Sequence, residues 1–242
     1  MAAMTSLMHR VRRRVLRFTG PRLRREWRGQ YGGRLTAWLY YHHRTVLKEK
    51  QVTWFGVPTV RSVWDTWIYQ EIVAETRPDL IIEIGSDAGG LTLFFAHLLD
   101  LLDIATGRVL SIDISRERWQ VSHPRIDMLT GSSGDPAIVA AAHAAAQNRR
   151  TLVLHDGDHH SEAVLRDLRA YADCVSPGSY FIVEDGIADV FVPGLGLGQI
   201  RSGPLVACRQ FLAERTDFVA DRARERYRVT YNPMGYLRRI SP

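Results

Sequence analysis

Two acidic clusters in the second half of the chain carry the side chains best suited to chemistry. His155-Asp156-Gly157-Asp158-His159-His160 and Glu184-Asp185-Gly186 each follow a short apolar run. Carboxylates crowded at the end of a sheet repel one another and raise one another's pKa unless a cation lies between them. Because oxygen ligands suit a hard divalent ion, we predict Mg²⁺ bound by Asp156, Glu184 and Asp185, with water and substrate completing its coordination.

His159 lies three residues after Asp156, close enough to face a metal-bound substrate without being a ligand. A nearby cation disfavours the imidazolium form and keeps the ring able to accept a proton near pH 7. We therefore predict His159 as general base, with Asp156 as its catalytic partner, although His160 remains an alternative base. Two other interpretations are a zinc site built from the three histidines and a cluster that only caps the helix beginning at Ser161.

A second group of residues has the pattern of a cofactor site. Glu83-Ile84-Gly85-Ser86-Asp87-Ala88-Gly89-Gly90 stands where a strand gives way to a helix, the place where open α/β sheets bind ligands. Asp113 ends the next strand, 28 residues after Gly85, where it could accept hydrogen bonds from a ribose. The glycine spacing differs from the G-x-G-x-x-G of dinucleotide folds and fits S-adenosylmethionine better than a nicotinamide. The predicted cofactor residues here are Glu83, Gly85, Ser86, Gly89, Asp113, Ser132, Ser133 and Asp156; an ordinary tight turn is the alternative.

The elements that position these residues alternate between short strands and longer helices, which is typical of βαβ units and a parallel sheet. The predicted strands are Leu80–Ile84, Val109–Asp113, Ile126–Thr130, Leu152–His155, Tyr180–Val183, Phe218–Ala220 and Tyr227–Thr230. The predicted helices are Val63–Glu75, Gly89–Leu102, Pro136–Gln147, Ser161–Ala172 and Leu205–Glu214, with a Gly-rich loop at Pro193–Gly198.

The net charge of +6 over 242 residues is unevenly distributed. Residues 1–30 hold nine arginines against one glutamate, so the remaining chain sums to −2 and is a poor nucleic-acid clamp. We predict an Arg-rich arm at 1–35 and a catalytic domain at 36–242. The arm is either a solvated or partner-packed extension or a helix on anionic lipid, with nucleic-acid contact the least favoured.

Composition excludes several classes of protein. No apolar run is long enough to span a membrane, and the two cysteines, Cys174 and Cys208, are too few for a disulfide framework or a zinc ribbon. We therefore expect a cytoplasmic protein, with peripheral membrane contact through residues 1–30 as an option.

The chain resembles the family named after cephalosporin hydroxylase, class I S-adenosylmethionine-dependent O-methyltransferases that include rhamnosyl and other sugar O-methyltransferases of actinobacteria. The resemblance runs from about Pro58 to Arg239 and rests on five blocks in order. They are Asp65–Gln70, Arg77–Gly85 with Gly89-Gly90, Asp156–His160, Gly178–Asp185 and Asn232–Leu237. No iron-binding triad supports the oxygenase chemistry in the family's historical name.

The resemblance implies a Rossmann-like class I methyltransferase with a seven-stranded, mostly parallel sheet and a final antiparallel strand. It adds Gln70 to the cofactor residues, supports magnesium at Asp156, Glu184 and Asp185, and implies a homodimer or larger homo-oligomer. We expect methyl transfer to a hydroxyl of a saccharide or glycolipid. The alternatives are an antibiotic or secondary-metabolite aglycone as acceptor, a nicotinamide oxidoreductase, an RNA methyltransferase using the arm, or a non-catalytic nucleotide-binding protein of this fold.

Overall fold

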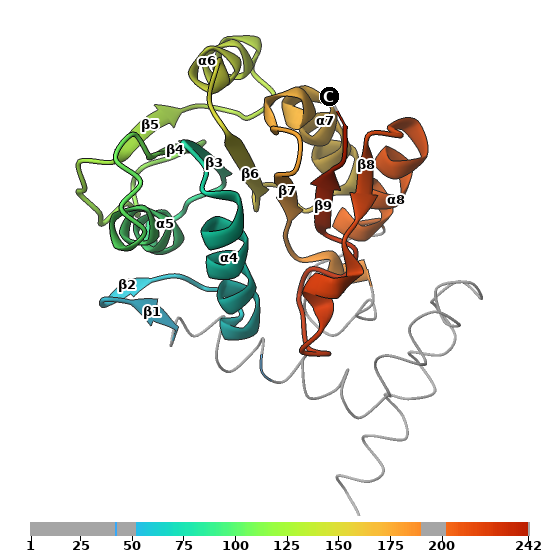
Figure 1. Ribbon diagram of the computed structural model, residues 1–242, viewed down its shortest axis with the longest axis horizontal. Coiled ribbons are helices and arrows are strands. Elements are labelled where there is room, and N and C mark those ends of the chain that lie inside the picture. The colour runs from blue at the N-terminus through green and yellow to red at the C-terminus, as the bar shows by residue number, and fades with distance from the viewer. Residues whose placement is uncertain (1–41, 43–51, 190–201, 242) are drawn as a thin grey trace, which may run out of the picture.

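The computed structural model describes residues 42, 52–189 and 202–241, in which a seven-stranded sheet lies between two layers of helices (Figure 1). Its strands are β3 (Leu80–Ile84), β4 (Arg108–Asp113), β5 (Ile126–Thr130), β6 (Thr151–His155), β7 (Tyr180–Val183), β8 (Phe218–Ala220) and β9 (Tyr236–Arg239). The spatial order is β5-β4-β3-β6-β7-β9-β8. Strands β3 to β7 pair in parallel, whereas β9 is antiparallel to both β7 and β8. The predicted seven-stranded, mostly parallel sheet is therefore confirmed.

The helices divide between the two faces of the sheet, as Figure 1 shows. The helices α4 (Val63–Thr76) and α5 (Gly90–Leu101) cover one face, and α6 (Pro136–Ala146), α7 (Ser161–Tyr171) and α8 (Pro204–Glu214) cover the other. Alternate residues of β3 enter different cores, because Ile81 packs with α4 and α5 whereas Ile82 packs with α7. Both faces of β3 are thus buried, which explains its continuous apolar sequence.

Smaller elements complete the fold. A two-stranded hairpin, β1 (Thr53–Trp54) with β2 (Val57–Pro58), packs beside α5. Short 3-10 helices occupy Ala172–Cys174, Gly186–Asp189 and Arg222–Glu225. The predicted helices and the first six predicted strands all form, with ends displaced by no more than one residue.

The prediction of a strand at Tyr227–Thr230 is wrong. In that segment Arg228 has a positive φ of 57°, and the Thr230 hydroxyl donates a hydrogen bond to Asp65 near the start of α4. The Tyr231 amide donates to the same carboxylate at 2.9 Å, so the segment is tied to α4 instead of to the sheet. The last strand is β9, in which Tyr236 and Leu237 are buried in the two different cores and Arg238 is exposed.

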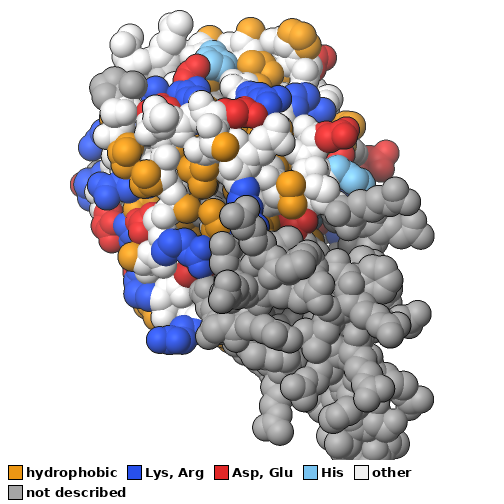
Figure 2. Space-filling view, turned by 90° about the vertical axis from the view of Figure 1, so that its right-hand side faces the viewer, with side chains coloured by type: hydrophobic (Ala, Val, Ile, Leu, Met, Phe, Trp, Pro, Cys, Tyr) orange, Lys and Arg blue, Asp and Glu red, His pale blue; other side chains and the backbone are white. Residues whose placement is uncertain are grey.

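The predicted arm at 1–35 and the Gly-rich loop at Pro193–Gly198 lie outside the described residues. Within the described ranges, no helix combines the length and the apolar character needed to cross a bilayer. Both cysteines are buried and unpaired. On the side that carries α8 and β8, basic side chains are scattered among acidic and apolar ones (Figure 2).

Candidate active site

The carboxyl ends of β3, β6 and β7 meet at one edge of the sheet and bring the two acidic clusters together. The Asp156 amide, just after β6, donates to the Ile84 carbonyl at the end of β3 at 2.7 Å. The Glu184 amide, just after β7, donates to the His155 carbonyl at 2.9 Å. Because these bonds continue the parallel ladder past the strands, the first acidic residue of each cluster has a fixed position.

Gly85 is required where β3 turns toward α5. Its φ of +86° lies in the left-handed region, and a Cβ built there would lie 2.2 Å from the Asp156 carbonyl oxygen. Only glycine lets the two backbones approach this closely. The predicted glycine turn therefore touches the first acidic cluster directly, which places the predicted cofactor turn and the predicted chemical residues side by side.

Asp113 shapes the same turn from the end of β4. One of its carboxylate oxygens, Oδ2, accepts hydrogen bonds from the amides of Ser86 at 2.7 Å and Asp87 at 2.8 Å. The Ser86 hydroxyl in turn lies 2.6 Å from that of Ser111 on β4. Gly89, with φ +88°, caps the N-terminus of α5. These predicted cofactor residues are therefore gathered around one turn, with Asp113 bracing its backbone.

Glu83 is buried on the α5 side of β3 and keeps one oxygen without a partner. The Thr92 hydroxyl donates to Oε2, whereas Oε1 has no hydrogen-bond partner among the described residues. Burial raises the pKa of Glu83 to about 7, although the Thr92 hydrogen bond opposes the shift. An unsatisfied buried acceptor beside a ligand turn fits a cofactor that donates hydrogen bonds or carries positive charge.

Asp156, His159 and Asp185 converge into a group that could hold a metal ion. One ligand atom of each lies within 4.8 Å of the other two. Oδ1 of Asp156 is buried and has no hydrogen-bond partner in the described part of the chain, and His159 Nε2 lies 3.6 Å from it. An orphaned carboxylate oxygen facing a second carboxylate has the chemistry of a divalent cation site, so these donors fit Mg²⁺.

The imidazole of His159 bridges the two acidic clusters. Its Nδ1 lies 2.7 Å from the Gly157 carbonyl and its Nε2 lies 2.8 Å from Oδ2 of Asp185. Burial alone would lower the pKa of His159, but the hydrogen bond and charge of Asp185, together with the charge of Asp156, raise it to about 10. Without a metal the ring is therefore an imidazolium that supplies the positive charge between the carboxylates.

Glu184 is turned away from this group and toward α4. The Tyr69 hydroxyl donates to Oε1 of Glu184 at 2.7 Å, and Nε of Arg61 lies 3.2 Å from the same oxygen. The Arg61 guanidinium also forms an ion pair with Asp156. Burial raises the pKa of both carboxyl groups, and the charge of Arg61 opposes the shift. Of the three predicted metal ligands, Asp156 and Asp185 thus face each other, whereas Glu184 lies on the Arg61 side of Asp156.

Three residues of this site were not predicted from the sequence: Arg61, Tyr69 and Asn232. The Asn232 side chain donates to the Tyr69 hydroxyl and accepts a hydrogen bond from the Asp185 amide at 3.0 Å. That support matters because Asp185 has φ +58°, a conformation that costs free energy for a residue with a side chain. Tyr69 and Asn232 stand inside the motif blocks of the resemblance, which was the available signal.

The remaining predicted residues have other partners. The Ser133 hydroxyl donates to Asp167 on α7 at 2.6 Å, and Nε2 of buried His155 lies 3.0 Å from the same oxygen. Ser132 accepts a hydrogen bond from the Gly134 amide at 3.3 Å. Gln70 is half-buried on α4, and no hydrogen bond joins its side chain to any of the other predicted site residues in the described ranges.

The interpretation of the histidine cluster as a zinc site is wrong. His155 faces Asp167, His159 faces Asp185, and Nδ1 of exposed His160 pairs with Asp158 at 2.5 Å. The three rings therefore have three different partners and do not converge on one point.

Taken together, the strand order, the antiparallel β9, the glycine turn after β3 and the acid ending β4 define the class I fold of S-adenosylmethionine-dependent methyltransferases. The model of the family "Rhamnosyl O-methyltransferase/CmcI" matches residues 47–240. The chain belongs to this family and is an O-methyltransferase, which confirms the resemblance found in the motif blocks.

Individual relatives agree with this assignment. A rhamnosyl O-methyltransferase of Mycobacterium leprae is 32% identical over 76% of this chain and 82% of its own length. One of Mycobacterium bovis is 29% identical over 77% of this chain and 78% of its own. Among solved structures, CmcI with Mg and S-adenosylmethionine has a TM-score of 0.63 at 21% identity, covering 79% of this chain and 78% of the other. Because the sequence identity is only 21%, this structural similarity is evidence for the fold alone.

Proposed function

We propose that this protein transfers the methyl group of S-adenosylmethionine to a hydroxyl of a sugar, in a reaction assisted by Mg²⁺ and with His159 as general base. The observation that carries the proposal is the convergence of Asp156, His159 and Asp185 directly beside the Gly85 turn. A cation held by the two carboxylates and a donor held at the turn would then be neighbours. The CmcI structure with Mg and S-adenosylmethionine supports both ligands.

His159 would act through Nε2. Because its Nδ1 is within hydrogen-bond distance of the Gly157 carbonyl, the neutral ring carries its proton on Nδ1 and offers the Nε2 lone pair to the acceptor hydroxyl. Positive charge near Asp156 and Asp185 would weaken their hold on the second proton and lower the pKa of the ring. Mg²⁺ at this position would polarise the acceptor hydroxyl and stabilise the negative charge developing on its oxygen.

The turn after β3 would position the methyl donor. Asp113 fixes the Ser86 and Asp87 amides. Glu83, two residues before Gly85, offers Oε1, which has no hydrogen-bond partner among the described residues. Holding the attacking oxygen and the methyl group in line at near contact can contribute roughly 7–11 kcal/mol to the rate enhancement. The general base contributes about 10²–10⁴-fold more. These residues thus account for orientation and proton removal, the two main requirements of an in-line displacement.

The sugar acceptor is supported by the names of the relatives, which are rhamnosyl O-methyltransferases. A sugar acceptor could also stack on aromatic side chains, for which the sequence offers Trp38, Tyr40, Tyr41, Trp54, Trp64 and Tyr236, but this idea receives less support. Tyr236 is buried and donates its hydroxyl to Asp65 at 2.7 Å, and Trp54 packs edge-on against Phe94. Trp64 is half-buried and lies 5.3 Å from the ring of His42, while Trp38, Tyr40 and Tyr41 lie outside the described residues.

Labelled product identification tests the proposal. The protein is incubated with Mg²⁺ and S-adenosylmethionine labelled in the methyl group, together with separate fractions of glycolipids, saccharides and aglycones. We expect label in an O-methyl group on a rhamnosyl or related sugar. Label on an aglycone hydroxyl would replace the sugar with the alternative acceptor. Tight S-adenosylhomocysteine binding without transfer to any fraction would instead favour the non-catalytic nucleotide-binding protein.

A further inference from the structure

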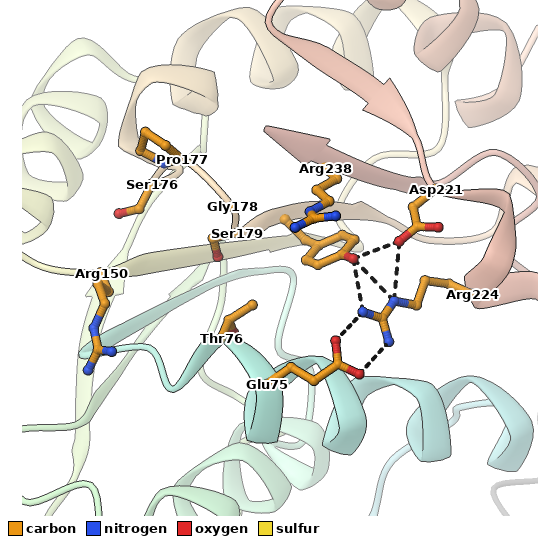
Figure 3. Close-up of a pocket in the computed structure, with 11 residues that line it drawn as sticks. Glu75, Thr76, Arg150, Ser176, Pro177, Gly178, Ser179, Asp221, Arg224 and Arg238 are labelled. Atoms are coloured by element: carbon orange, nitrogen blue, oxygen red, sulfur yellow. Dashed lines mark hydrogen bonds and ion pairs between the residues drawn. The ribbon is translucent and has the colours of Figure 1, made fainter. Parts of the chain in front are cut away.

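A pocket opens at the edge of the sheet opposite the candidate active site. It has a volume of about 310 Å³ and is lined by residues that precede β6 and β7, the C-terminal end of α4, and β9 (Figure 3). The strands β6 and β7 run from this pocket to Asp156 and Glu184 at their other ends. The pocket is therefore separate from the site at which methyl transfer is proposed.

Two hydrogen-bond donors in this pocket lack partners in the described part of the chain. Arg238 is exposed on β9, and no hydrogen bond or ion pair joins its side chain to any residue in the described ranges. The Ser179 hydroxyl likewise has no hydrogen-bond partner among the residues that the structure describes, although Ser179 is only 5% exposed. Figure 3 shows the Arg238 side chain extending toward the Ser179 side of the pocket. A buried hydroxyl without a partner costs free energy that a bound ligand would recover.

The acidic groups of the pocket are already paired. Nη1 of Arg224 donates to Glu75 at 3.0 Å, and Nε of Arg224 lies 3.4 Å from Asp221. Tyr180 donates its hydroxyl to Asp221 at 2.7 Å. The hydrogen bond from Arg224 lowers the pKa of Glu75, which keeps this carboxylate ionised and paired. Arg150 adds further positive charge at the opposite rim, where it also pairs with Asp79.

We infer that this pocket binds the phosphate group of a small phosphate monoester. A free guanidinium and an unpartnered hydroxyl are donors that match phosphate oxygens, and guanidinium binds phosphate bidentately. The volume lies near the lower end of the range of about 300–1,000 Å³ for small-molecule sites, so there is room for a short organic group besides the phosphate.

Titration of the full-length protein with glycerol 3-phosphate, followed by amide chemical shifts, tests the inference. Sodium chloride at matched ionic strength and unphosphorylated glycerol serve as controls for the titrant. We expect saturable shifts at Ser176–Tyr180 and around Arg238, at least threefold tighter binding than with inorganic phosphate, and no such shifts with glycerol. Shifts of the same residues with glycerol alone, or shifts confined to the Gly85 turn, would overturn the inference.

Variants separate the pocket from general charge effects. Arg238→Gln should weaken binding at least tenfold and Ser179→Ala at least threefold, because each removes one unpartnered donor. Arg228→Gln is the matched control, since Arg228 is exposed and does not line the pocket. Unchanged affinity for S-adenosylhomocysteine would show that each variant is folded. Equal phosphate-ester affinity in wild type and Arg238→Gln would contradict the proposal.

Discussion

The Nε atom of Arg61 lies 3.2 Å from Oε1 of Glu184, so a buried guanidinium from the segment before α4 neutralises a carboxylate that follows β7. The same group pairs with Asp156 after β6. Arg61 thus supplies positive charge to Asp156 and Glu184, and His159 supplies it to Asp185. A divalent cation held by Asp156 and Asp185 would add to this arrangement.

Replacing Arg61 with methionine should destabilise the metal-free protein by about 3–5 kcal/mol, because two buried carboxylates lose their charge partner. The measurement is urea unfolding in the presence of a chelator. Arg108→Met is the control, since it breaks a partly exposed pair with Asp127 that is worth at most about 1 kcal/mol. Equal losses in the two variants would show that Arg61 has no special role.

His159→Ala should lower kcat by about 10²–10⁴-fold, the contribution expected of a general base, while affinity for S-adenosylhomocysteine stays within about twofold. His160→Ala is the control, because His160 is exposed and, among the described residues, its side chain pairs with neighbouring Asp158 alone. Single-turnover kinetics and calorimetry separate the two effects. If His160→Ala lost activity and His159→Ala kept it, the identity of the base would be reversed.

The raised pKa of His159 predicts how stability depends on pH. Its pKa is about 10 in the metal-free folded protein, against an ordinary value of 6.5. The stabilisation from protonated His159 is therefore fully present below pH 6.5 and is lost as the pH rises through 10.

The difference in free energy of unfolding between wild type and His159→Gln should accordingly be largest near pH 6 and shrink steadily toward pH 10. Chelator is present throughout, and the titratable groups that do not contact His159 titrate alike in both proteins. A difference that does not vary over this range would contradict the proposed ion pairs with Asp185 and Asp156.

Gly85→Ala should destabilise the protein strongly and abolish binding of S-adenosylhomocysteine, because the new Cβ would lie 2.2 Å from the Asp156 carbonyl oxygen. Gly56→Ala is a matched control. Gly56 has a similar φ of +82°, but its Cβ would meet no atom within 4 Å. Thermal melts should therefore show a small decrease in melting temperature for Gly56→Ala, due to backbone strain alone, and a much larger decrease for Gly85→Ala. Similar losses would show that close approach is unimportant.

Local patterns predicted most of the fold because apolar runs and helix periodicity are local signals. The prediction of a strand at Tyr227–Thr230 was wrong because Thr230 and the next residue, Tyr231, are hydrogen-bonded to Asp65, which is far away in the sequence. Arg61 was missed for the same reason, as nothing near it in the sequence indicates that it meets Asp156 and Glu184. The positions of the strand ends predicted that the two acidic clusters meet. They did not predict that Glu184 bonds to Tyr69, or that His159 lies with Asp156 and Asp185 in the candidate metal site.

Metal dependence of methyl transfer tests the central proposal most directly. Transfer from labelled S-adenosylmethionine to a rhamnosyl glycoside is measured with Mg²⁺, after chelation, and after Mg²⁺ is restored, in wild type and in Asp185→Asn. We predict that chelation abolishes transfer, that Mg²⁺ restores it, and that Asp185→Asn requires at least tenfold more Mg²⁺. Undiminished transfer in the chelated wild type, with Asp185→Asn behaving identically, would contradict the account.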